Sequence, residues 1–98
     1  MDDEKEYLAQ LKQQRHMYQW CLREIGKLSE TEARVQAKQF YKYESQSGEH
    51  RTLVFHDDAW HWAMLKIYGE NYWVEHPELA EPSSDYESEC VFYEGNIT

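Results

Sequence analysis

Residues 4–26 read EKEYLAQLKQQRHMYQWCLREIG, and this stretch indicates the fold class most clearly. Large apolar side chains recur along it at the spacing of one side of an α-helix. They are Tyr7, Leu11, Tyr18, Leu22 and Ile25, with Leu8 and Cys21 beside them. Trp20 projects from the far side of the same helix, because successive residues advance by about 100°. The sequence therefore predicts a helix over about 4–25 that packs one side into a core.

The glycine spacing predicts how this helix continues into a fold. Gly26, Gly48 and Gly69 divide the first 69 residues into three stretches of similar length without proline. Glycine is favoured just past the end of a helix, so we expect three helices of roughly 18–22 residues. Similar lengths with short links are typical of an up-down-up bundle. The predicted fold is mainly α, with a three-helix bundle over 1–69 and an acidic, partly extended C-terminal arm over 70–98 packed on the same domain.

The second stretch supports two interpretations. It begins with Ser29-Glu30-Thr31-Glu32, a capping box that predicts the start of a helix. Apolar residues then recur at helical spacing, which favours a helix. They are Ala33, Ala37, Phe40 and Tyr41. The same region alternates between apolar and polar residues, however, and residues 35–43 could pair with the β-prone run 51–56 as a small hairpin, which would give an α+β fold.

The third stretch and the C-terminal arm are less regular. Residues 49–68 carry apolar side chains in nearly every direction, as in a central helix or one that also serves an interface. If 51–56 is a strand, Asp57 caps a shorter helix over 58–68. Residues 76–84 read as turns. Residues 85–93 alternate in polarity, which indicates a short strand or an extended packed arm.

Charge is distributed unevenly along the chain. The 98 residues include 19 acids against 10 Lys and Arg, for a formal net charge of −9. Residues 67–98 hold eight of the acids and neither Lys nor Arg. Binding to duplex nucleic acid requires a basic face, so nucleic acid is not an expected partner. Without a run of 18 apolar residues we expect no membrane partner, and without a leader-like start we expect a cytoplasmic protein.

The motifs that carry chemistry are incomplete in this chain. His56 and His61 are five residues apart, so they do not form the zinc-protease pair of histidines four apart. Asp58 and His61 have the i, i+3 spacing of bundle metal sites, but a second such pair is missing. Neither a nucleophile turn nor a phosphate loop occurs. We therefore expect no enzyme, no resident metal and no cofactor.

Aromatic residues suggest a different role. Three of the four tryptophans, Trp60, Trp62 and Trp73, lie within 14 residues. Trp60 and Trp62 point about 200° apart on a helix, and a core this small is not expected to bury both. Either the segment after Gly69 folds back over the outer indole, or an indole stays exposed at an interface, where tryptophan is a frequent anchor.

The resulting hypothesis is a non-enzymatic protein-binding module, whose partner is another protein or a second copy in a homodimer. The predicted contacts are Trp20, Trp60, Trp62 and Trp73, with Asp85, Glu87 and Glu89 as an acidic rim. Two alternatives remain: an inhibitor that mimics nucleic acid to occupy a DNA-binding protein, and a metal-binding helical protein that uses Asp58 and His61.

Overall fold

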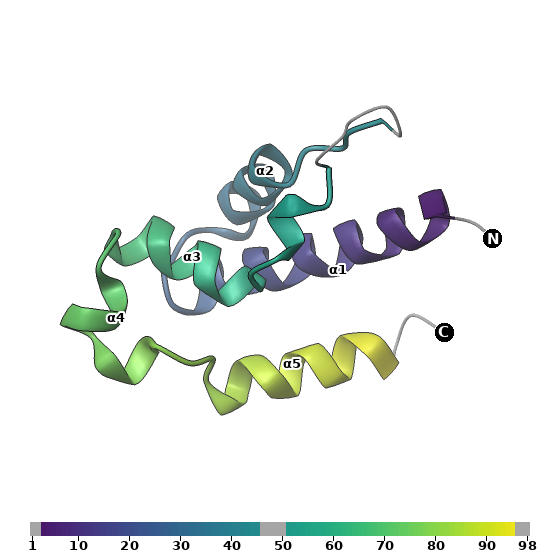
Figure 1. Cartoon of the computed structure of the whole chain (residues 1–98). Coiled ribbons are helices and arrows are strands. Elements are labelled where there is room, and N and C mark those ends of the chain that lie inside the picture. The colour runs from purple at the N-terminus through teal and green to yellow at the C-terminus, as the bar shows by residue number, and fades with distance from the viewer. Residues whose placement is uncertain (1–2, 46–50, 96–98) are drawn as a thin grey trace.

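The chain is mainly helical (Figure 1). This computed structural model describes residues 3–45 and 51–95, and side chains from Glu4 onward. Its α-helices are α1 (Asp3–Glu24), α2 (Glu30–Phe40), α3 (Ala59–Tyr68), α4 (Tyr72–Glu75) and α5 (Ser84–Gly95). Two short 3₁₀ turns, η1 (Leu53–Phe55) and η2 (Pro77–Leu79), precede α3 and follow α4. No β-strand occurs within those ranges, so the α+β alternative with a 35–43/51–56 hairpin is wrong there.

Helix α1 is the centre of the fold and contacts α2, α3 and α5 (Figure 1). Its predicted stripe is confirmed, because Tyr7, Leu11, Tyr18 and Leu22 are buried. Met17 is also completely buried, so more of the α1 surface is packed than a single stripe requires. One long helix therefore carries the other elements around it.

Helix α2 begins as the sequence predicts. The Ser29 hydroxyl accepts a hydrogen bond from the Glu32 amide at 3.1 Å, and the Glu32 carboxylate accepts one from the Ser29 amide at 3.3 Å. This reciprocal capping box satisfies two amides that the first turn leaves unpaired. Ala33 and Ala37 are buried, and such small side chains let α2 approach α1 closely. The glycine predicted to end this stretch, Gly48, lies outside the described residues.

The third predicted helix is shorter than expected. Residues 51–58 form a turn, η1 and a bend, and α3 has only 10 residues. Asp58 caps α3, since its carboxylate accepts the His61 amide at 3.0 Å. The cap is thus Asp58 and not Asp57, because Asp58 has the extended backbone that an N-cap requires. An up-down-up bundle of three similar helices is not confirmed.

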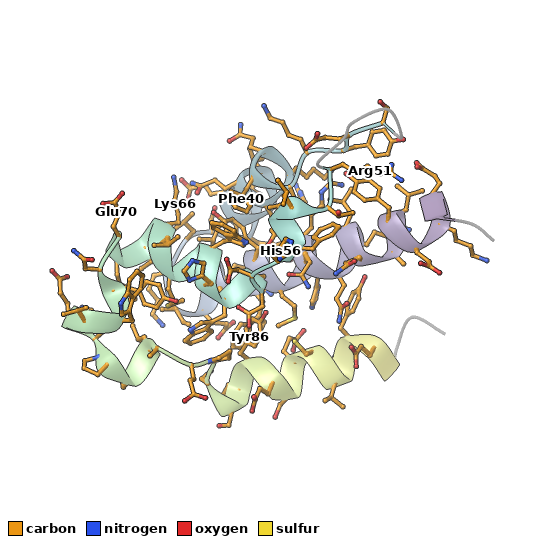
Figure 2. All side chains as sticks on the ribbon, viewed as in Figure 1. Phe40, Arg51, His56, Lys66, Glu70 and Tyr86 are labelled. Carbon is orange, nitrogen blue, oxygen red and sulfur yellow. The ribbon has the colours of Figure 1, made fainter. Side chains whose placement is uncertain are left out.

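The C-terminal segment is helical, so the prediction of a short strand or an extended arm over 85–93 is wrong. Ser83 begins α5 by accepting the Tyr86 amide on its hydroxyl at 3.1 Å. Tyr86, Cys90 and Tyr93 recur at helical spacing on the side of α5 that packs inward. Tyr86 points from α5 toward α1 and α3 (Figure 2). The strand-like alternation was misleading because Tyr86 and Cys90 fit both periods, whereas Ser88 and Phe92 are exposed on the helix.

None of the described helices combines the length and the apolar character that crossing a bilayer requires.

Candidate protein-docking surface

Two of the predicted contact residues lie on opposite sides of α3, and the chain covers both. Trp60 is only 2% exposed, and its indole N–H donates to the carbonyl of Leu79 in η2 at 2.9 Å. Trp62 is partly buried, and its N–H donates to the carbonyl of Val54 in η1 at 2.9 Å. The core thus buries Trp60 completely and Trp62 only in part, as a core this small was expected to do. Turn η2 thus covers Trp60, and turn η1 covers part of Trp62.

The other two tryptophans differ in exposure. Trp20 on α1 is partly buried, and its ring meets Tyr86 edge-on with centroids 6.1 Å apart. Trp73 on α4 is 45% exposed. All four tryptophans lie within the described residues, and among them only Trp73 presents a large part of its ring to solvent.

The predicted acidic rim lies on another helix. Asp85 and Glu87 are exposed on α5. Glu89 instead accepts from His16 on α1 at 2.7 Å, so this carboxylate helps to hold α5 in place. The structure does not bring these acids together with Trp73 on one element, because Trp73 belongs to α4.

Local sequence explains why α4 turns away from α3. Gly69 ends α3 with a positive φ of 102°, a conformation that favours glycine, and its amide donates to the Leu65 carbonyl at 3.0 Å. The chain then reverses, and the Asn71 carbonyl accepts the amides of Val74 and Glu75 at 2.9 and 3.1 Å. The result is a single helical turn at one end of the molecule (Figure 1).

Tyr72 fixes α4 to α3. Its ring is buried, and its hydroxyl shares a 3.0 Å hydrogen bond with Nδ1 of His61. Burial, and secondarily the nearby charges of Asp58 and Asp57, raise the pKa of Tyr72, so this hydroxyl keeps its proton. The Trp73 ring lies 5.2 Å from the Tyr72 ring and 6.3 Å from His61 between centroids. Trp73 is thus supported on its inner side while its outer side remains exposed.

Further exposed apolar and acidic residues lie close to Trp73 in the sequence. Val74 is 65% exposed, and the exposed Tyr68 ring lies 4.7 Å from the ring of His76. Glu70 points outward at this end of the molecule (Figure 2), and Glu75 and Glu78 are exposed close by in sequence. We call this set, Tyr68, Trp73 and Val74 with Glu70, Glu75 and Glu78, the α4 surface. Sequence reasoning missed its acids, although three glutamates within five residues of Trp73 were a usable signal.

The α3 residues that were candidates for metal binding have structural partners. The Asp58 carboxylate caps α3, and the His61 ring is bonded to Tyr72. No group of three or more His, Cys, Asp or Glu that could hold a metal converges anywhere in residues 3–45 and 51–95. The thiol of Cys21 is fully buried, and this burial, with the charge of Asp58, raises its pKa and suppresses the thiolate.

Comparison with known proteins identifies no relative: no family model matches the chain, and neither a curated protein nor a solved structure does.

Proposed function

We propose that this chain is a protein-binding module whose α4 surface docks on a partner segment that carries both apolar and basic residues. The exposure of Trp73 carries this proposal, because the other three tryptophans are wholly or partly buried by the chain. Tryptophan is among the residue types most enriched at the centres of protein interfaces.

The surroundings of Trp73 favour tight docking. Tyr72 and His61 support its ring from behind, so part of its rotational freedom is already lost before a partner arrives. Preorganisation of this kind lowers the entropic cost of association. Val74 extends the apolar area on the same turn of α4. A partner with an apolar pocket or groove would therefore bury both side chains.

Charge selects the kind of partner. The α4 surface belongs to residues 67–98, which contain eight acids and neither Lys nor Arg. Glu70, Glu75 and Glu78 would form a rim that attracts basic residues and repels acidic ones. The charge would mainly accelerate association, and this contribution should weaken as salt is added.

The test is capture of a partner from an extract of the cells that make the protein, with wild type and Trp73→Ala compared by quantitative mass spectrometry. Removing a central tryptophan should cost about 2 kcal/mol or more, or roughly thirtyfold in affinity. The matched control is Val35→Ala, because Val35 is similarly exposed but lies on α2. A partner that wild type and Val35→Ala retain and Trp73→Ala loses would support the proposal.

Two outcomes would contradict it. One is a set of captured proteins that Trp73→Ala leaves unchanged. The other is capture of a DNA-binding protein that is insensitive to Trp73→Ala and abolished by salt, which would support the nucleic-acid mimic instead.

A further inference from the structure

This acidic molecule also carries a groove lined by basic and apolar side chains. It has a volume of about 540 Å³ and runs along the N-terminal half of α1 beside the end of α5. Lys5, Leu8, Ala9 and Lys12 of α1 line it together with Tyr93 of α5. Residues at this spacing share one face of a helix, so two cations flank an apolar strip.

The register of α1 against α5 shows why the α5 of the same chain cannot fill this groove. The two helices are antiparallel, since Trp20 meets Tyr86 and His16 meets Glu89. In this register Lys12 is level with the C-terminal end of α5. The first two turns of α1 therefore extend past the end of α5.

The outward side of α5 has the complementary composition. Ser84, Glu87, Ser88 and Val91 line a second, shallow groove there. Val91 is 69% exposed, the highest exposure among the large apolar side chains of the described residues. This face carries the acid Glu87 and the exposed Val91 beside two serines, so it would repel a copy of itself and attract a basic and apolar face.

The two faces also match in spacing when they are read in opposite directions. Each carries a charged residue, an apolar residue four positions away and another charged residue three positions further. The matching residues are Lys12 with Glu87, Leu8 with Val91, and Lys5 with Glu94. Both patterns extend over about 10.5 Å of helix, at 1.5 Å per residue. Opposite charges and apolar residues would therefore meet along two antiparallel helices.

We propose that the groove on α1 binds the outward face of α5 from a second copy of this chain. Lys12 with Glu87 and Leu8 with Val91 carry the contact, because Glu94 already accepts a hydrogen bond from Gln13 of its own chain at 3.0 Å. The proposal uses α1 and α5 and is independent of the α4 surface.

The experiment is sedimentation velocity over a wide range of protein concentrations at low salt. Wild type should associate reversibly. Lys12→Glu and Glu87→Lys should each raise the dissociation constant about tenfold, because an attractive pair becomes a repulsive one. The double variant Lys12→Glu/Glu87→Lys restores the attraction with the charges exchanged, so its dissociation constant should return close to the wild-type value.

The matched control is Lys38→Glu, which makes the same change in net charge at an exposed position on α2. It separates the specific contact from general repulsion between acidic copies. Circular dichroism of each variant establishes that the helices are intact. A protein that stays monomeric at every concentration, a Lys38→Glu effect equal to that of Lys12→Glu, or a double variant as weak as the singles would each overturn the inference. Any of these results would leave the proposed docking through Trp73 unaffected.

Discussion

Truncation of Tyr86 to alanine should release α5 from the rest of the molecule. Tyr86 is 4% exposed, and its ring meets the rings of Trp60 and Trp20 at centroid distances of 5.5 and 6.1 Å. Removing a buried aromatic side chain costs about 3–5 kcal/mol. Whole domains of this kind are stable by only about 5–15 kcal/mol. The expected loss is therefore a large share of the stability that α5 depends on.

The remaining links between α5 and α1 are too weak to compensate. They include the hydrogen bonds from Gln13 to Glu94 and from His16 to Glu89, and the stacked rings of His16 and Tyr93. Both bonds end on carboxylates at exposed or partly exposed positions, where solvent limits such contacts to about 0–1 kcal/mol each. An isolated helix of 12 residues, the length of α5, is marginal in water. We therefore expect α5 to unfold locally while α1, α2 and α3 remain folded.

Hydrogen–deuterium exchange with mass spectrometry measures this outcome directly. In Tyr86→Ala, amides of 84–95 should exchange rapidly while those of α1 keep their protection. Tyr86→Phe keeps the ring and should retain α5. Ser88→Ala is the matched control, because Ser88 is exposed on the same helix and its change should alter stability by less than about 0.5 kcal/mol. Protection of 84–95 in Tyr86→Ala equal to wild type would refute the reasoning.

Three further predictions concern single groups. Asp58→Ala removes the cap of α3 and should lower the free energy of unfolding, measured by urea titration, by about 1 kcal/mol. Asp57→Ala should lower it by less than half as much. Equal effects of the two variants would contradict the assignment of Asp58 as the cap. Burial raises the pKa of both cysteines, and Cys21 is buried whereas Cys90 is only partly buried. Iodoacetamide should therefore label Cys90 first in the folded protein. In urea it should label both cysteines at similar rates, as peptide mass spectrometry would show. Burial also raises the pKa of Tyr41 above its ordinary 10.0, so the folded state retains this proton after the unfolded state has lost it, and stability should fall as the pH rises above about 10. The Tyr41 hydroxyl has no hydrogen-bond partner among the described residues, so Tyr41→Phe should keep or increase stability at neutral pH; a loss of more than about 1 kcal/mol would contradict this. The same variant should reduce the alkaline decline, to which Tyr86, whose pKa burial also raises, still contributes.

Local signals predicted the elements that depend on local interactions. The stripe on α1 spans several turns of one helix, and the capping box of α2 needs only residues 29–32. The start of α3 was ambiguous because Asp57 and Asp58 are both good caps, and the bend of the chain before them decides between the two. Helix α5 was missed because Tyr86 and Cys90 fit both the helical and the strand period, and only packing against α1 and α3 decides between the two.

The candidate site was predictable only in part for a similar reason. Sequence spacing places Trp60 and Trp62 on opposite sides of a helix, but it does not say what covers each side. The residues that cover them are Leu79 and Val54, whose carbonyls accept the indole hydrogen bonds and which belong to turns outside the helix. Tertiary contacts of this kind leave no local pattern in the sequence. The sequence alone therefore did not show which of the tryptophans the chain covers and which it leaves exposed.

The same contacts connect the core to the α4 surface. The indole of Trp60 holds η2 through the Leu79 carbonyl, and His61, its neighbour on α3, holds the start of α4 through the Tyr72 hydroxyl. The segment 72–79, which includes α4 and Trp73, is therefore held at both ends by adjacent residues of one helix. A short helical turn has little stability of its own, so this double attachment determines where Trp73 points. The buried Trp60 thus helps to fix the segment that carries the exposed Trp73.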